Sequence, residues 1–394
     1  MRPASWLQQT RPAALVVDYS GDGALADGAV AICSLREAQD WVSDRWHDAG
    51  SIPALASALR VAGARAVCIV GVPQPDGRTL RWLDTEHARG WVAPACETAG
   101  RCEVFANELA AAMGRGFVAA DAAILATMAT TRRAASEVEF VNDPALLPQL
   151  SWGEEQRFAP AGPGRADSRR LDLYAIVDSA ARLQQVLDAG IPTVQLRIKM
   201  PASPDTGWYA MLRRELRHGI EACESAGAEL FVNDHWQMAA ELGAHGVHLG
   251  QEDLLALGEA GRSALQATGL ALGVSSHSLW ELCRARMLAP RYIACGPVWP
   301  TLTKAMPWVA QGLDNLAWWC RMAPAPVVAI GGVLGPEQVR DAARSGADGV
   351  CIVRGLGSSP QRVVPALQAA LEAGRAGHTL KGAAAAWPHP SLAA

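Results

Sequence analysis

The residues with the clearest chemical potential lie between Gly296 and Lys304, in the run Gly-Pro-Val-Trp-Pro-Thr-Leu-Thr-Lys. The apolar segment 292–298 has the composition of a buried strand, and the glycine and proline residues near its end are typical of a strand terminus. Thr301, Thr303 and Lys304 then offer two hydroxyls and an ammonium, which are donors that can hold a phosphate. A solvated turn has the same composition, so this run predicts an anion site only if other segments bring charge to the same place.

A second group of candidate residues lies in the run Val-Gln-Leu-Arg-Ile-Lys at 194–199. Alternate side chains of a strand share a face, which places Gln195, Arg197 and Lys199 on one side and apolar residues on the other. Burying two cations without anionic partners costs several kcal/mol each. Either internal carboxylates or an anionic substrate must therefore face them, and the substrate is the better explanation.

Two carboxylates follow the next two predicted strands. Asp234 comes after Asn233 at the end of one strand, and Asp253 closes the run that begins at His248. Carboxylates at neighbouring strand ends, beside phosphate, suit an oxygen-ligated Mg²⁺. Each Asp could instead cap the helix that follows it, which is a common position for this residue. His248 is interpreted as a hydrogen-bonding residue of the interior rather than as a catalytic group.

Small and polar residues end the remaining strands. Ser275 and His277 end the fifth predicted strand, Gly332 the seventh, and Val353 and Arg354 the eighth. Glycine lets backbone N–H groups approach a phosphate closely. The sequence thus predicts two phosphate sites, one cationic and metal-assisted and the other made largely of backbone and hydroxyl donors.

The segments that carry these residues alternate strands with helices. Strands are predicted at 173–177, 193–199, 229–234, 246–249, 270–277, 292–298, 327–333 and 349–354. Helices are predicted at 181–189, 208–226, 236–242, 256–267, 279–288, 313–322, 336–345 and 361–373. Because each parallel strand needs a right-handed helical crossover, this pattern predicts a closed TIM (β/α)8 barrel over residues 171–374, with its site at the carboxyl ends of the strands. The Ala-, Gly- and Pro-rich segment 375–394 predicts a disordered tail.

The first third of the chain predicts a smaller α/β domain over residues 1–135. Its strands are predicted at 14–18, 30–34 and 66–72, and its helices at 35–46, 52–61, 102–113 and 119–132. The irregular stretch 136–170 is rich in Pro and Gly and predicts a linker.

Composition narrows the functional classes. The 394 residues carry a formal net charge of -4 and have a pI near 6.2, which argues against nucleic acid or an anionic membrane as a partner recruited by overall charge. The nine cysteines form no Cys-x-x-Cys pair, so neither a disulfide framework nor a zinc site is indicated. No signal peptide and no run of about 18 apolar residues is present. These features predict a cytoplasmic protein and leave a homo-oligomer open.

Residues 172–356 resemble the thiamine phosphate synthases. The motifs that carry this resemblance are, in family order, Gln195-Leu-Arg-Ile-Lys199, Asn233-Asp234, Gly246-Val-His-Leu-Gly-Gln-Glu-Asp253, Gly273-Val-Ser-Ser-His277, Gly296-Pro-Val-Trp-Pro-Thr-Leu-Thr-Lys304 and Ala329-Ile-Gly-Gly332. The resemblance implies a Mg²⁺-assisted dissociative reaction, in which 4-amino-2-methyl-5-pyrimidinylmethyl diphosphate is joined to a thiazole ethyl phosphate and pyrophosphate is released.

The resemblance also implies a role for each matching residue. The pyrimidine diphosphate would be held by Gln195, Leu196, Arg197, Ile198, Lys199, Asn233, Ser275 and Lys304. The catalytic residues among them would be Arg197, Lys199, Ser275 and Lys304. Mg²⁺ would be bound by Asp234 and Asp253. The thiazole phosphate would be held by Thr301, Leu302, Thr303, Gly332, Val353 and Arg354.

Two residues depart from the family pattern. Ile198 replaces a usual acidic residue, a change expected to be mild if its side chain points outward. Arg354 stands where many members carry Ser, so it either strengthens phosphate binding or blocks the backbone site. A regulatory thiazole tautomerase and a non-catalytic ligand-binding or scaffold protein are the rival interpretations. Retention of the cations and carboxylates argues against the tautomerase.

The N-terminal domain resembles, faintly, a truncated hydroxymethylpyrimidine (phosphate) kinase of the ribokinase-like group. The matching segments are Ser34-Leu-Arg-Glu37 and the segment 98–110, in which Cys102 takes the catalytic position. Most of the glycines that close around phosphate in that family are absent, and Arg101 stands where the backbone must approach the anion. The resemblance therefore implies a degenerate domain kept for packing, solubility or assembly.

Overall fold

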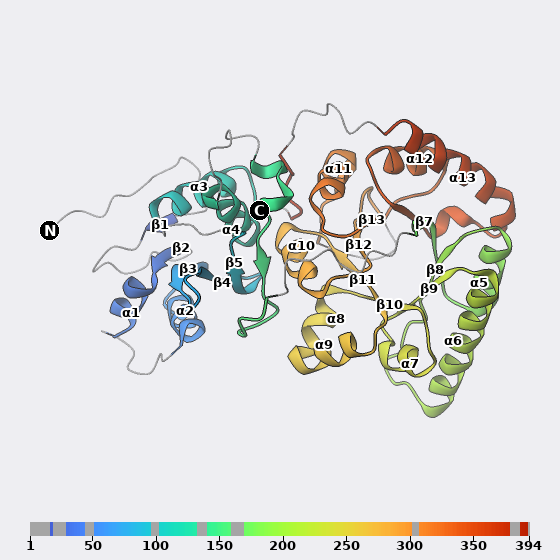
Figure 1. Ribbon diagram of the computed structural model, residues 1–394, viewed down its shortest axis with the longest axis horizontal. Coiled ribbons are helices and arrows are strands. Elements are labelled where there is room, and N and C mark those ends of the chain that lie inside the picture. The colour runs from blue at the N-terminus through green and yellow to red at the C-terminus, as the bar shows by residue number, and fades with distance from the viewer. Residues whose placement is uncertain are drawn as a thin grey trace. The chain divides into compact units, whose positions relative to one another are not determined.

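The computed structural model describes residues 16–18, 29–43, 51–95, 102–131, 140–158, 169–301, 307–378 and 387–392 (Figure 1). The chain divides into two compact units. Unit 1 comprises residues 1–160, 278–287 and 389–394, and unit 2 comprises residues 161–277 and 288–388. No helix within the described ranges has both the length and the apolar character needed to cross a membrane.

Unit 2 contains a closed barrel of parallel strands, as the sequence predicts. Its strands are β7 (Asp172–Val177), β8 (Thr193–Leu196), β9 (Glu229–Asn233), β10 (Gly246–Leu249), β11 (Ala271–Ser276), β12 (Tyr292–Cys295), β13 (Val327–Ala329) and β14 (Gly349–Ile352). Strand β14 pairs with β7 and so closes the ring. The carboxyl ends of all these strands therefore meet at one rim, which is where a TIM barrel places its chemistry.

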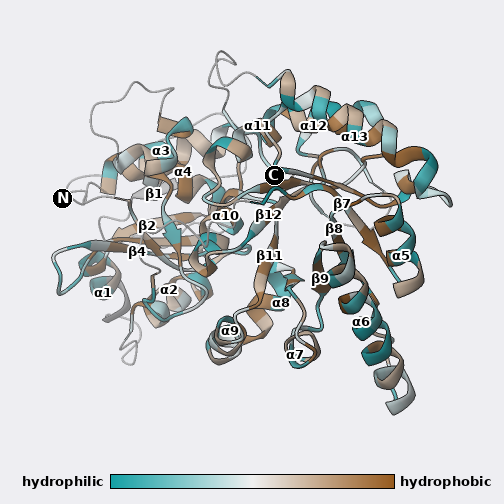
Figure 2. Cartoon of the chain, turned by 45° about the vertical axis from the view of Figure 1, so that its right-hand side comes forward, coloured by the Kyte–Doolittle hydropathy of each residue, from teal (hydrophilic) through white to brown (hydrophobic). Residues whose placement is uncertain are grey.

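Helices surround the barrel and follow its strands. They are α5 (Ala180–Asp188), α6 (Thr206–Ala226), α7 (Trp236–Glu241), α8 (Gln251–Ala256), α9 (Gly258–Ala267), α11 (Gly312–Met322), α12 (Pro336–Arg344) and α13 (Pro360–Ala376), with the short 3-10 helix η4 (Arg354–Leu356) after β14. Local chemistry sets their ends: Asp205 caps α6 by accepting the Trp208 amide at 2.7 Å, and Gly227 ends the same helix at φ 62°. Figure 2 shows long hydrophilic stretches on α5 and α6, whereas the barrel strands are mostly hydrophobic.

The barrel interior is filled by aromatic rings. Tyr174, Phe231 and Tyr292 are fully buried and pack edge to face, with the Phe231 and Tyr292 centroids 5.0 Å apart. Two glycines make room for them: a Cβ atom at Gly273 would overlap the Tyr292 ring, and one at Gly246 would lie 2.8 Å from the Phe231 ring. The interior is thus a packed core rather than a channel.

Unit 1 is built on a mixed six-stranded sheet in the order β1 to β6. The strands are β1 (Val16–Asp18), β2 (Val30–Ser34), β3 (Ala66–Pro73), β4 (Thr79–Asp84), β5 (Arg89–Ala93) and β6 (Gln149–Leu150). Pairing is parallel from β1 to β3 and antiparallel from β3 to β6. The helices of unit 1 are α1 (Leu35–Ser43), α2 (Ile52–Val61), α3 (Cys102–Gly114), α4 (Ala119–Thr131), α10 (Leu279–Ala285) and the 3-10 helices η1 (Phe140–Asn142) and η2 (Pro144–Leu146); the 3-10 helix η3 (Arg286–Leu288) spans the boundary between the units.

Two segments of the chain have more structure than the sequence predicts. The stretch expected to be a linker contains η1, η2 and strand β6, which pairs with β5. In the segment expected to be a disordered tail, α13 continues to Ala376, and Ser391 and Leu392 are buried. Apolar residues such as Phe140 and Leu150, buried in unit 1, explain why the Pro and Gly content of 136–170 was misleading.

Helix α10 follows the fifth barrel strand in sequence but belongs to unit 1. Ser278 caps the helix, and the carboxylate of Asp121 in α4 accepts the Leu279 and Trp280 amides at 2.8 and 3.2 Å. Complete burial raises the pKa of Asp121 to about 8, although the two amide donors act in the opposite direction. Arg284, on the next turn of α10, lies 5.4 Å from the Trp152 ring centroid.

Candidate active site

Strand β8 ends earlier than its alternating sequence predicts. Gln195 is buried and faces the interior, but the strand stops at Leu196. Arg197 is half-buried and Lys199 is exposed, so the prediction that the barrel buries both cations is wrong. The Arg197 amide still donates to the Val177 carbonyl at 2.7 Å, which holds the segment after Leu196 at the carboxyl rim.

His235 holds the same rim segment from the neighbouring strand. Its Nε2 lies 2.9 Å from the carbonyl oxygen of Ile198. Ile198 itself is buried. His235 is not among the residues predicted from sequence, although its position directly after Asp234 is a usable signal.

The two carboxylates come close enough to influence each other. Asn233 ends β9 and is buried, and Asp234 follows it with a left-handed backbone at φ 65°. Although Asp234 is exposed, loss of surrounding water raises the pKa of its carboxyl group, and the charge of Asp253 raises it further. His235 and Arg197 act in the opposite direction on this pKa. Strain at a rim residue of this kind is frequent at functional sites.

The helix-capping alternatives hold for one carboxylate only. The N-cap residue of α7 is His235, and it makes no side-chain capping bond. Asp253 does take part in the start of α8, where its Oδ2 accepts the Gly250 amide at 3.1 Å. Asp234 therefore has no capping role at α7, and Asp253 keeps its second oxygen outside the capping bond.

The residues present fit a Mg²⁺ ion shared with a ligand. Among the described residues, no group of three or more His, Cys, Asp or Glu side chains is arranged to hold a metal by itself. Loss of surrounding water is the main cause of the raised pKa of Asp234, and the charge of Asp253 adds to it; a divalent cation between the two carboxylates would offset both effects. Two carboxylates completed by phosphate oxygens and water form the ligand set that Mg²⁺ prefers.

Ser275 and His248 meet at the inner edge of the rim. The Ser275 hydroxyl lies 2.8 Å from Nε2 of His248, and Nδ1 of His248 lies 2.7 Å from the hydroxyl of Tyr292. Burial lowers the pKa of His248 to about 3, and Arg197 and His277 add to this effect. His248 is therefore a neutral hydrogen-bonding residue of the interior, in agreement with its interpretation from sequence.

The loop after β12 is fixed at both ends. The backbone amide of Trp299 donates to the Gly331 carbonyl at 3.1 Å, and the backbone amide of Gln311 donates to the Pro297 carbonyl at 2.7 Å. The His277 ring stacks on Trp308 with centroids 4.9 Å apart. Thr301 is half-buried. The other predicted site residues of this loop, Leu302, Thr303 and Lys304, lie outside the described residues.

The glycines after β13 permit a close approach of two loops. Gly331 and Gly332 have φ values of 93° and 74°. A Cβ atom at Gly332 would lie 2.5 Å from the Cβ atom of Trp299. Any other residue at this position would therefore clash with Trp299 and would also have to adopt a left-handed backbone conformation. Beyond β14, Val353 and Arg354 are exposed, and Arg354 begins η4.

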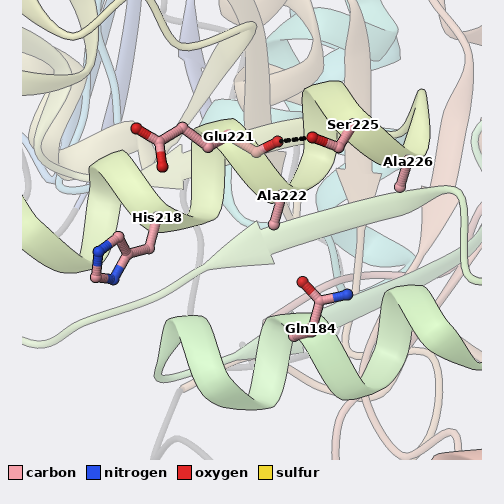
Figure 3. A pocket seen from close by; sticks show the side chains of 6 residues that line it. All are labelled: Gln184, His218, Glu221, Ala222, Ser225 and Ala226. Carbon is pink, nitrogen blue, oxygen red and sulfur yellow. Dashed lines mark hydrogen bonds between the residues drawn. The ribbon is translucent and has the colours of Figure 1, made fainter.

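Two hollows occur elsewhere on unit 2. One, of about 510 Å³, is an open depression between α5 and α6, lined by Gln184 of α5 and by His218, Glu221, Ala222, Ser225 and Ala226 of α6 (Figure 3). The other, of about 700 Å³, lies beside Arg291 and Ala271, at the amino ends of the strands. Neither hollow is lined by a predicted site residue.

Comparison with known proteins agrees with these features. The family model described as thiamine monophosphate synthase matches residues 173–356. The thiamine-phosphate synthase of Rhizobium etli is 42% identical over 193 residues, which cover 48% of this chain and 90% of that protein. That of Neisseria meningitidis serogroup A is 42% identical over 202 residues, covering 50% and 94% of the two chains. The solved thiamine phosphate pyrophosphorylase of Pyrococcus furiosus is 25% identical, with a TM-score of 0.44 over 52% of this chain and 96% of that chain. Through its C-terminal half, the chain belongs to the thiamine-phosphate synthase family.

Proposed function

We propose that the barrel of unit 2 is a thiamine-phosphate synthase, which joins 4-amino-2-methyl-5-pyrimidinylmethyl diphosphate to a thiazole ethyl phosphate and releases pyrophosphate. Family membership supports the reaction. The structural observation that supports it most is the mutual influence of charges at the carboxyl rim. Loss of surrounding water raises the pKa of Asp234, and the charge of Asp253 raises it further. The charges of His235 and Arg197 lower it. Positive groups beside a carboxylate pair suit a diphosphate with its metal ion.

In this proposal, the chain's own residues hold the leaving group. The C–O bond of the pyrimidinylmethyl group breaks, its electron pair departs with pyrophosphate, and the thiazole nitrogen attacks the resulting cation. Arg197, Lys199 and Lys304 place positive charge where negative charge grows, which stabilises bond breaking more than substrate binding. Mg²⁺ on Asp234 and Asp253 would supply a Lewis acid for the diphosphate oxygens. No side chain needs to act as a nucleophile.

The remaining predicted residues would position the two substrates. We assign the pyrimidine diphosphate to Gln195, Leu196, Ile198, Asn233 and Ser275, in addition to the cations. The thiazole phosphate is assigned to Thr301, Leu302, Thr303, Gly332, Val353 and Arg354. Arg354 is exposed, and we propose that it is an added phosphate ligand rather than a side chain that blocks the site. A cytoplasmic location and a homo-oligomer stay predictions from sequence.

The test is an assay of the purified full-length chain for pyrophosphate release. Release should require both substrates and Mg²⁺. Lys304→Ala should fold normally and lose roughly a hundredfold in turnover, because one stabilising charge is removed from the transition state. Lys381→Ala, which removes a lysine that is not assigned to the site, is the matched control. Near-wild-type turnover of Lys304→Ala would contradict the assignment, and release from a single substrate would contradict the reaction.

For unit 1 we propose a degenerate kinase-like domain without phosphoryl transfer. Strand β2 leads directly into α1 through a capping box, in which Ser34 and Glu37 exchange bonds of 2.6 and 3.2 Å, and α3 begins at Cys102. These positions support the resemblance stated from sequence. The full chain, given ATP and hydroxymethylpyrimidine phosphate, should form no ADP above background. ADP formation that depends on the pyrimidine would show a working kinase.

A further inference from the structure

A hydrogen-bonded chain of five side chains crosses the inside of the barrel. It runs from Gln195 through Tyr174, Tyr292 and His248 to Ser275, with successive distances of 3.2, 2.6, 2.7 and 2.8 Å. The first four residues are buried, and Ser275 is half-buried near the carboxyl end of β11. The chain therefore joins Gln195 and Ser275, which are both assigned to the substrate site, through the barrel core.

The amide of Gln195 decides the direction of every bond in this chain. Its Nε2 donates to the Tyr174 oxygen. Among the described residues, the hydroxyl of Tyr292 is the acceptor within reach of the Tyr174 proton; the reverse order would bury that proton without a partner, so Tyr174 donates to Tyr292. Tyr292 must then donate to Nδ1 of His248, which leaves the imidazole proton on Nε2. A doubly protonated imidazole does not fit this order, because Tyr292 would have no acceptor within the chain for its own proton.

The bond between His248 and Ser275 leaves the hydroxyl proton of Ser275 without an acceptor in the chain. With its proton on Nε2, His248 donates to Ser275, whose oxygen accepts. In the part of the protein that the structure describes, the Ser275 side chain makes no other hydrogen bond. The Ser275 hydroxyl proton thus has no acceptor in the described chain and stays available for a ligand.

We propose that Tyr174, Tyr292 and His248 are positioning residues, which reserve the Ser275 hydroxyl proton for an acceptor atom of the pyrimidine diphosphate. This inference rests on the proposed function, because it places Ser275 in the substrate site. The reverse order, with Ser275 donating to His248, would leave the hydroxyl only lone pairs with which to meet a substrate rich in acceptors.

Packing keeps the chain in one arrangement. Gly273 pairs with both His248 and Tyr292 in the sheet, and the absence of a side chain at Gly273 lets the Tyr292 ring reach across β11 to His248. The Tyr292 ring stacks on the imidazole at 5.7 Å and 19°, and meets the Tyr174 ring edge to face. A ring held on several sides loses little entropy when its hydroxyl is ordered.

The imidazole tautomer tests the direction without any assay of activity. Nitrogen NMR of the full chain, with labelled histidine, should show His248 protonated on Nε2 and unprotonated on Nδ1. The His248→Gln variant, which lacks this signal, assigns it. Tyr292→Phe should shift the tautomer, because it removes the proton that Nδ1 accepts. A proton on Nδ1 in the wild type would overturn the inference.

Kinetics test whether the chain acts through Ser275. Tyr292→Phe keeps the ring and should lower kcat roughly tenfold, about the effect of one or two lost hydrogen bonds. In a Ser275→Ala background, the same change should have no further effect on kcat. Tyr209→Phe, at an exposed tyrosine of α6, is the matched control. His248→Gln should retain more turnover than His248→Leu, because the glutamine amide still offers an N–H group to Ser275.

The two proposals fail in different ways. An inactive wild-type chain whose His248 carries its proton on Nε2 would contradict the proposed function and leave the ordered chain standing. An active chain in which Tyr292→Phe costs the same factor with and without Ser275 would overturn the positioning role alone.

Discussion

Replacing Asp121 by asparagine should abolish a loss of stability that the wild-type protein suffers as pH rises. Asp121 is fully buried in α4, and one of its oxygens accepts both amides at the start of α10. Asparagine keeps a carbonyl oxygen for these two amides but cannot ionise. The variant therefore isolates the charge of the carboxylate from its hydrogen bonds.

The size of the effect follows from the shifted pKa. Burial raises the pKa of Asp121 from 3.8 to about 8, so the folded chain binds a proton that the unfolded chain has already released. Stability is then greatest below about pH 4, falls through the window up to about pH 8, and levels off above it. A shift of this size at 1.36 kcal/mol per pKa unit corresponds to a loss on the order of 5 kcal/mol across the window.

Hydrogen exchange of the Leu279 and Trp280 amides is the direct assay. The ratio of protection in Asp121→Asn to protection in the wild type, measured on the full chain, cancels the intrinsic pH dependence of exchange. This ratio should rise steadily between about pH 4 and pH 8. Asp188→Asn, at an exposed aspartate of α5, should give a ratio that does not change with pH. If the ratio for Asp121→Asn also stays constant, the buried carboxylate is ionised in the folded protein and the reasoning is refuted.

Two further predictions concern the rim. Asp234→Asn should raise the Mg²⁺ concentration for half-maximal activity by at least roughly tenfold, because one of two carboxylate ligands is lost. A Mg²⁺ titration of activity measures this, and an unchanged midpoint would place the metal elsewhere. Gly332→Ala should cost about 1–3 kcal/mol from its backbone strain alone, with more from the contact with Trp299, and should raise KM for the thiazole phosphate. Gly357→Ala is the control for denaturant unfolding, because Gly357 also has a positive φ, 55°, but has open space around it. Equal losses of unfolding free energy in the two variants would show that the contact with Trp299 does not contribute.

Much of the fold could be predicted because the apolar runs have sharp boundaries. Strands β2 and β10 and helix α2 begin and end at the predicted residues, since turns and caps frame them. The antiparallel strands β4 and β5 were not predicted, because Arg81, Asp84 and Arg89 interrupt their apolar pattern. Arg81 is buried, and exposed Arg89 is held by tertiary contacts such as its ion pair with Asp84 at 3.2 Å, which the local sequence does not reveal.

The sequence predicts which residues belong to the candidate site better than it predicts how they are arranged. The alternation at Gln195 and Arg197 predicts one continuous strand, whereas the strand ends at Leu196. The role of Tyr292 could not be predicted from the sequence. A tyrosine at the start of a strand fits the same sequence pattern whether or not its hydroxyl forms a hydrogen bond. Only the register, which sets Gly273 between Tyr292 and His248, reveals the contact.

The assignment of α10 to unit 1 matters for anyone who would produce the barrel alone. Every residue of this helix is buried, including Trp280 and Leu282. A gene fragment that starts at residue 161 would keep the helix but lose Asp121 and Trp152, so its first turn would lack the acceptor for two amides and its apolar surface would meet solvent. Such a fragment should aggregate during expression, and a graft that supplies a polar surface to α10 would be the first step in making the barrel independent.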